Sequence, residues 1–168
     1  MKQFHEITPQ EIRGNPFQMI GADWMLITAG QGSAVNTMTA SWGGVGIMWG
    51  RPVATIVIRP QRYTKEFVDA AATFSLSFLD SRYRSQLDYL GSVSGRNEPK
   101  IARSGLTLAE TDDTPYFAES SLVLVCRKLY HQTYDPAGFI DPTLAENYPK
   151  QDYHTLYIGE IVKVLQAD

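Results

Sequence analysis

Apolar and polar side chains alternate along much of the chain with a period of two, which predicts a protein built mainly from β-strands. The run at residues 52–59 is nearly continuous and β-branched, which is typical of a central strand. Residues 17–30 are expected to form two strands joined by a turn at 21–23, and 31–33 resembles a hairpin turn. Further strands are expected at residues 36–42, 73–79, 106–111, 119–132 and 153–165.

Helical spacing appears only in short segments between these strands. Helices are expected at residues 60–72, 82–90 and 100–104, and a turn of helix in an N-terminal arm at 1–15. Residues 135–150 are rich in proline and turn-forming residues, which predicts an excursion with at most one helical turn. Strands and helices without regular alternation favour a mainly β fold, an antiparallel β-barrel with helical insertions, as one domain over residues 1–168.

Composition and charge narrow the classes of function. The 168 residues are 43% hydrophobic and 20% charged, with a formal net charge of −3. A nucleic-acid-binding protein normally carries a basic stripe, so nucleic acid is not an expected partner. No apolar run reaches the length of a signal peptide or a membrane span, so we expect a cytoplasmic protein without a membrane partner.

Several kinds of catalytic site are not supported by the sequence. The three histidines lie far apart and the chain has a single cysteine, Cys126, so no metal site is expected. Cys126 lies in an apolar strand, where a buried structural thiol is favoured over a reactive one. The segment GSVSG has Val93 where a nucleophile elbow would need serine.

The junction after the strand at 52–59 gathers positive charge. Arg59 ends the strand, and Arg62 and Thr64 lie at the expected start of the next helix, with Thr64 at or near its N-cap. Two guanidinium groups, a hydroxyl and free backbone N–H groups are suited to a phosphate. In the alternative interpretation, the arginines pair with Glu66 and Asp69 or remain solvated, and Thr64 only caps the helix.

The strand at 36–42 has small side chains that leave room for a flat ring against the backbone. Thr39, Ala40 and Ser41 are three consecutive small residues, and four glycines follow between residues 43 and 50. If this strand lies beside residues 52–59, main-chain groups can bind the polar edge of the ring and a glycine loop can cover one face. The candidate aromatic walls are Trp42, Trp49 and Tyr63. The alternative is an ordinary strand followed by a flexible hairpin.

A ring site beside a phosphate site matches the two ends of flavin mononucleotide (FMN). The segment NTMTASWGGVGIMWGRPVATIVIRPQRYTKEFV, residues 36–68, closely resembles the FMN-binding core of the flavin reductase-like family, which includes flavoredoxins and has a split-barrel fold. The resemblance continues through FSLSFL, GSVSGRNEPKIARSGL, ESSLVLVCR and HTLYIGEIVKV, and so covers nearly all of the chain from Asn15 onward.

The resemblance implies roles for three groups of residues. The ring and ribityl chain would contact Asn36, Thr37, Met38, Thr39, Ala40, Ser41 and Trp42. The phosphate would bind Arg59, Arg62 and Thr64. The loop carrying Ser94, Arg96 and Lys100 would approach the cofactor or a nicotinamide. Members of the family are homodimers with flavin sites near the subunit boundary, so a homodimer is expected.

His154 is the candidate catalytic residue. Relatives often carry Gly-Asp-His with a glycine five residues after the histidine, and His154 and Gly159 keep this spacing. The residues before the histidine are Asp152 and Tyr153, so the carboxylate is one position off. Asp152 and His154 would share one face of a strand, where the carboxylate can orient the imidazole. The alternative is a structural histidine in the barrel.

These features predict an FMN-binding oxidoreductase that passes electrons from NADH or NADPH through FMN to a small acceptor. The protein would hold the ring with one face open and stabilise negative charge near N1 of the reduced flavin. The alternative is a flavoredoxin-type carrier that exchanges electrons with redox partner proteins. A structural domain with a vestigial pocket is a third interpretation.

Overall fold

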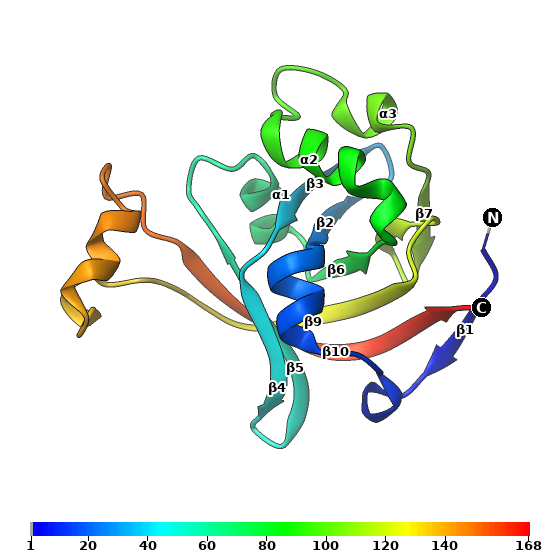
Figure 1. Ribbon diagram of the computed structural model, residues 1–168, viewed down its shortest axis with the longest axis horizontal. Coiled ribbons are helices and arrows are strands. Elements are labelled where there is room, and N and C mark those ends of the chain that lie inside the picture. Colours follow the sequence, from blue (N-terminus) through cyan, green and yellow to red (C-terminus); the bar gives the residue numbers. More distant parts are fainter. Residues whose placement is uncertain (1) are drawn as a thin grey trace.

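The computed structural model describes residues 2–168 and confirms a mainly β fold of the split-barrel type (Figure 1). Strands pair in the order β3-β2-β6-β9-β10-β5-β4, with β1 added to β10, and β7 and β8 form a separate hairpin. Their bounds are β1 (Phe4–Ile7), β2 (Met25–Gln31), β3 (Ala34–Ala40), β4 (Gly43–Met48), β5 (Arg51–Ile58), β6 (Thr73–Phe78), β7 (Leu108–Thr111), β8 (Thr114–Phe117), β9 (Leu122–Thr133) and β10 (Thr155–Ala167).

The long strands β9 and β10 pair with each other in the middle of the sheet order. Their pairing shifts register between Ile158 and Gly159 and again between Ile161 and Lys163, which bends the sheet. A Cβ atom at Gly159 would lie 2.9 Å from both Cβ of Cys126 and Cζ of Phe74, so this position requires glycine. Cys126 is fully buried, and burial raises the pKa of its thiol well above the ordinary range, in agreement with a structural role.

Three short helices cover the upper part of the barrel in Figure 1: α1 (Thr64–Ala70), α2 (Arg84–Ser92) and α3 (Lys100–Ser104). The C-terminal end of α1 is held by Lys128, whose Nζ donates to the carbonyls of Val68 and Asp69. The helices α2 and α3 pack on a second apolar cluster, formed by Leu26, Leu79, Leu87, Leu90, Leu106 and Phe117. None of the helices within residues 2–168 is long and apolar enough to cross a membrane.

The strand expected at the start of residues 17–30 is wrong. Residues Phe17–Asp23 form a π-helix, in which Phe17 is exposed and Ile20 is buried. Gln18 Nε2 donates to Asp23 Oδ1 over 2.8 Å, and Arg84 Nη1 donates to the carbonyl of Ala22 over 2.7 Å. The bond from Arg84 comes from a distant part of the chain, so local periodicity contains no sign of it.

The expected glycine loop is also wrong. Residues 43–48 form β4, which pairs along its length with β5 in a hairpin that projects from the barrel (Figure 1). Trp49 and Gly50 form its turn with φ of 51° and 70°, the left-handed values that a tight hairpin requires. Two further strands, β1 and β8, were not predicted. The excursion at 135–150 contains two 3₁₀ helices, Pro136–Gly138 and Pro142–Asn147, so it has more than the one helical turn expected.

Candidate flavin site

Two cavities lie side by side where β3 approaches the end of β5, and they share Met38, Arg59 and Arg62. We call the first, of about 420 Å³, the cation cavity; it is lined by Asn36, Met38, Arg59, Gln61, Arg62, Tyr63, Thr64, Ser92, Val93, Ser94 and Lys100. We call the second, of about 260 Å³, the ledge cavity; it is lined by Met38, Thr39, Ala40, Ser41, Trp42, Val57, Arg59, Arg62 and His154.

The cation cavity holds two positive charges without a counter-ion. Lys100 is only 3% exposed, and its Nζ donates to the carbonyls of Leu90 over 2.9 Å and Val93 over 3.0 Å. Arg62 Nη1 donates to the carbonyl of Gly91 over 2.7 Å. Neither side chain forms an ion pair with a carboxylate of residues 2–168. Buried charges are normally paired, so this arrangement favours a bound anion.

The electrostatics of the two groups support the same interpretation. Burial, and then the charge of Arg62, lowers the pKa of Lys100 to about 8. Burial, and then the charge of Arg59, lowers the pKa of Arg62 from its ordinary value. Each positive charge is therefore held at a cost in desolvation and repulsion, which an anion in the cavity would relieve.

Arg59 lines both cavities, but its guanidinium is already bound by protein groups. Nη1 donates to Asp152 Oδ2 over 2.8 Å, Nη2 donates to the carbonyl of Asn147 over 2.8 Å, and Cζ lies 5.0 Å from the ring centroid of Tyr148. The alternative pairing with Glu66 or Asp69 does not occur. Arg59 therefore joins the 135–150 excursion to the site. The side chain of Arg62 makes a single hydrogen bond to residues 2–168, from Nη1, so its other N–H groups are available to a ligand.

Thr64 is the first residue of α1 rather than its N-cap, which is Tyr63. Its hydroxyl accepts a hydrogen bond from Asn36 Nδ2 over 3.0 Å, and both residues are buried. A Cβ atom at Gly95 would lie 2.4 Å from Asn36 Oδ1, so the loop after α2 packs directly against Asn36. These contacts bring β3, α1 and the 92–97 loop together around the cation cavity.

Two of the predicted cofactor residues lie outside both cavities. Arg96 pairs with Glu66, donates to the carbonyl of Gln61 over 3.2 Å, and stacks 4.5 Å from the ring centroid of Tyr63. Thr37 is buried against β2, where its hydroxyl donates to the carbonyl of Ile27. Arg96 therefore supports the Tyr63 wall of the cation cavity, since it contacts both the Tyr63 ring and the carbonyl of Gln61.

The ledge cavity is formed by the end of β3 and the two residues that follow it. Thr39 Oγ1 donates to the carbonyl of Leu87 over 2.6 Å, so this hydroxyl anchors α2 instead of facing a ligand. Ala40 is 8% exposed and belongs to the core, while Ser41 is more open. Trp42 is 48% exposed and lies over His154, with ring centroids 5.2 Å apart. The ledge cavity thus combines a row of small residues with larger groups, Trp42 and His154 among them.

Two expectations about the ring site are corrected. The strand at 36–42 does not lie next to residues 52–59 in the sheet order: β3 pairs with β2, and the curl of the barrel brings its end close to Val57 and Arg59. Trp49 is not a wall of the site, because the β4–β5 hairpin places it 60% exposed near Tyr130, with ring centroids 6.4 Å apart.

His154 lies just before β10 and is 7% exposed. Its Nδ1 is 2.8 Å from the hydroxyl of Tyr148. The expectation that Asp152 orients His154 is wrong, since Oδ2 of Asp152 accepts from Arg59 and Gln61. Burial, and then the charge of Arg59, lowers the pKa of His154 to about 4, so the imidazole is neutral at physiological pH.

Tyr148 was not predicted as a site residue. It lies in the excursion among a cluster of aromatic rings formed by Tyr134, Phe139, Tyr148, Tyr153 and His154. The only sign of this cluster in the sequence is the number of aromatic residues between 134 and 153. So many aromatic residues indicate that the excursion packs against something, but they do not indicate which part of the molecule it contacts.

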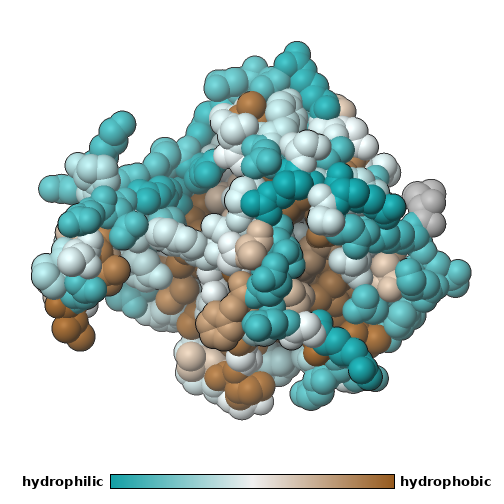
Figure 2. Space-filling model, viewed as in Figure 1, coloured by the Kyte–Doolittle hydropathy of each residue, from teal (hydrophilic) through white to brown (hydrophobic). Residues whose placement is uncertain are grey.

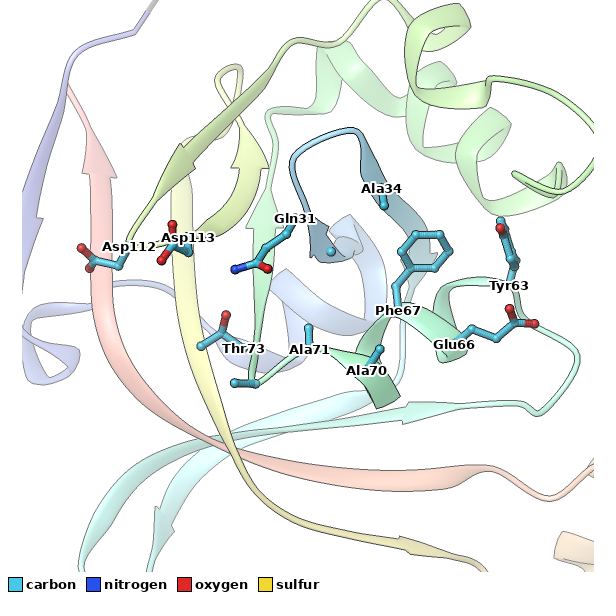
Figure 3. A pocket seen from close by; sticks show the side chains of 12 residues that line it. Gln31, Ala34, Tyr63, Glu66, Phe67, Ala70, Ala71, Thr73, Asp112 and Asp113 are labelled. Carbon is cyan, nitrogen blue, oxygen red and sulfur yellow. The ribbon is translucent and has the colours of Figure 1, made fainter.

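A third cavity, of about 660 Å³, lies between the β2–β3 turn, α1 and the β7–β8 turn (Figure 3). Phe67, Ala70 and Ala71 give it an apolar floor, and Tyr63 is its only residue shared with the cation cavity. Asp112 at its rim pairs with Lys163. Despite its larger volume, it does not bring predicted cofactor residues together. No group of three possible metal ligands occurs within residues 2–168.

Comparison with known proteins shows the family. The profile described as "Flavin reductase like domain" matches residues 18–168, and the chain belongs to this family. A protein of Aeropyrum pernix described as uncharacterized is 31% identical over 100 residues, which cover 58% of this chain and 38% of that protein. The chain thus matches well under two thirds of this relative's length.

Solved structures share the fold. The FMN-binding domain of a flavin reductases-like enzyme from Shewanella baltica has a TM-score of 0.72 and 19% identity, over 98% of this chain and 78% of that chain. Flavoredoxin from Desulfovibrio vulgaris (Miyazaki F) has a TM-score of 0.67 and 24% identity, over 86% of this chain and 69% of that chain.

Proposed function

We propose that the protein binds FMN across the cation and ledge cavities and acts as an FMN-dependent NAD(P)H oxidoreductase. One observation supports this most strongly: a cavity with a buried lysine and a half-buried arginine, neither paired with a carboxylate of residues 2–168, opens directly beside a cavity that the small residues 39–41 help to line. FMN has a phosphate at one end and a planar ring at the other. Together the two cavities fall within the roughly 300–1,000 Å³ typical of small-molecule sites.

In this proposal the phosphate lies in the cation cavity. Arg62 and the third N–H of Lys100 would donate to its oxygens, with the hydroxyl of Ser94 as a further polar group at the lining. Thr64 is already engaged by Asn36 and acts mainly by fixing the wall of the cavity. Arg59, whose charge is paired with Asp152, acts mainly by holding the 135–150 excursion against the two cavities.

The ring lies in the ledge cavity against the backbone of residues 39–42 and the side chain of Val57. Trp42 and His154 border it on the side of the excursion. Bound FMN supplies hydride and single-electron chemistry. The residues of this chain would orient the ring, exclude water from one face and place polar groups near the reduced ring's negative charge.

A homodimer is part of the proposal. Val45, Ile47, Met48 and Trp49 expose apolar surface on the β4–β5 hairpin, and β4 is the last strand of the sheet order within residues 2–168. Apolar atoms gather over this hairpin at the lower end of the molecule in Figure 2. An exposed apolar edge strand favours pairing with another chain.

The flavoredoxin-type carrier is the second candidate, and the family includes structures of both descriptions. Anaerobic mixing of the FMN-loaded protein with NADH or NADPH distinguishes the two. We expect the flavin band near about 450 nm to bleach within seconds. Failure to bleach with either nicotinamide, combined with rapid reduction by a ferredoxin-like donor, would establish the carrier and overturn the reductase.

A further inference from the structure

The contact between Tyr148 and His154 determines which nitrogen of the imidazole carries the proton. Both side chains are 7% exposed, and the hydroxyl lies 2.8 Å from Nδ1. Within residues 2–168 the hydroxyl has no other hydrogen-bond partner, and Nε2 of His154 has none at all. Nδ1 of His154 thus has a hydrogen-bond partner in Tyr148. Nε2 is the ring nitrogen that remains available to a ligand in the ledge cavity, which His154 lines.

Only one neutral tautomer satisfies the buried groups on the Tyr148 side. If Nδ1 carried the proton and donated to Tyr148, the phenolic hydrogen would have no acceptor in a buried position. If the hydroxyl donates to Nδ1, both groups are satisfied and the proton of the ring lies on Nε2.

We propose that Tyr148 is a positioning residue that fixes His154 as the neutral Nε2–H tautomer and so presents an N–H donor to the ring held in the ledge cavity. The identity of that ring rests on the proposed function. A neutral imidazole donor places positive density beside the developing negative charge of a reduced ring without transferring a proton to it.

The charged groups around His154 agree with a neutral ring. Burial has the largest effect and, together with Arg59 and Arg62, outweighs the opposing charge of Asp152, so the pKa of His154 is lowered to about 4. Burial also raises the pKa of Tyr148, so its hydroxyl keeps its hydrogen. The donor is therefore present throughout the neutral range.

The test is a two-bond ¹H–¹⁵N spectrum of the flavin-free protein, recorded from about pH 5.5 to 8.5. His154 is assigned by the signals that disappear in His154→Gln. We expect a protonated Nε2, an unprotonated Nδ1, and no titration over this range. A ring protonated at Nδ1, or one that titrates near the ordinary histidine pKa, would overturn the inference.

The Tyr148→Phe variant removes the hydroxyl, and Tyr153→Phe is its matched control because Tyr153 packs on Tyr148 with ring centroids 5.0 Å apart. We expect Tyr148→Phe to show both tautomers and, relative to its affinity for oxidised FMN, to bind reduced FMN about three- to tenfold more weakly. Tyr153→Phe should match the wild type. A Tyr148→Phe protein that keeps one tautomer and an unchanged affinity ratio would contradict the inference.

The two proposals fail in different ways. The spectra need no flavin, so a wrong tautomer overturns the role of Tyr148 and leaves FMN binding untouched. Absence of FMN binding overturns the proposed function and removes the ring from this inference, while the tautomer assignment stands. If Tyr148→Phe does not fold, the wild-type spectrum alone decides the tautomer.

Discussion

Asn36 Nδ2 donates to Thr64 Oγ1 over 3.0 Å and joins β3 to the first turn of α1. Both residues are buried, so the bond fixes the spacing between two walls of the cation cavity. Replacing Asn36 with alanine leaves the Thr64 hydroxyl without this donor. We expect the free energy of unfolding to fall by about 1–3 kcal/mol and FMN binding to weaken. Urea denaturation and FMN titration measure the two effects.

Gly95→Ala also tests the contact between Asn36 and Thr64, because Gly95 packs against Asn36. A Cβ atom there would lie 2.4 Å from Asn36 Oδ1, so the amide must move away from Thr64. We expect weaker FMN binding from this one added methyl group. Gly46→Ala is the control, since a Cβ atom at Gly46 meets nothing within 4 Å. Equal FMN affinity in the two variants would show that the position of Asn36 is unimportant for the cavity.

Arg62→Ala removes a half-buried cation that forms no ion pair with a carboxylate of residues 2–168. A charge-assisted hydrogen bond contributes on the order of 1.5–3 kcal/mol, so we expect FMN affinity to fall about tenfold to a hundredfold. Riboflavin, which lacks the phosphate, should bind equally well to wild type and variant. Arg103→Ala, which removes an arginine paired with Glu98 on the surface, is the control. Loss of riboflavin binding in Arg62→Ala would place this arginine beside the ring instead.

Lys100 should make FMN binding depend on pH. Its pKa is lowered to about 8, so its ammonium is present below this pH and is lost as the pH rises through it. A phosphate dianion favours the ammonium, so FMN affinity should fall above about pH 8. Fluorescence titrations at several pH values measure this decline, which Lys100→Met should not show. An identical decline in Lys100→Met would assign it to another group.

As the pH rises, the stability of the flavin-free protein should increase, whereas its affinity for FMN should fall. Between about pH 8 and the ordinary value of 10.5, the unfolded chain binds more protons at Lys100 than the folded protein does. The contribution of this residue to the free energy of unfolding therefore rises with pH across that window. Thermal denaturation of wild type and Lys100→Met should show this rise only in the wild type. A parallel pH dependence in both proteins would contradict the assignment.

Ser41→Phe should block the ring without unfolding the protein. Ser41 lines the ledge cavity and lies outside the core cluster, whereas the neighbouring Ala40 is part of that cluster. A phenyl group at Ser41 fills the cavity, so we expect neither FMN nor riboflavin to bind while the circular dichroism spectrum remains unchanged. Ser85→Phe on the exposed face of α2 controls for added apolar surface. A Ser41→Phe protein that purifies yellow would place the ring elsewhere.

Local periodicity was sufficient for the strands at 73–78 and 155–167 and for α3, because their alternation or spacing directly reflects burial. It failed at residues 17–23, a π-helix whose carbonyl at Ala22 accepts a hydrogen bond from the distant Arg84. It also failed at the glycines of β4. There the residues pair with β5 in a projecting hairpin, and their small side chains carry little of the pattern that identifies a strand.

The candidate site, like the fold, could be predicted only in part from the sequence. The positive junction and the small-residue strand could both be recognised from residue types, and the structure brings them together around Arg62. The different roles of Arg59 and Arg62 could not be recognised, because they depend on where the excursion folds back onto the barrel. Tyr148 was missed for the same reason, since its contact with His154 depends on the path of that excursion.

Equilibrium titration of the wild-type protein with FMN and with riboflavin, followed by flavin fluorescence, tests the central claim most directly. The claim requires that a single ligand fill the cation cavity with its phosphate and the ledge cavity with its ring. We expect saturable binding of one FMN per chain, with an affinity at least about tenfold above that for riboflavin. No binding of FMN, or equal affinity for the two flavins, would contradict it.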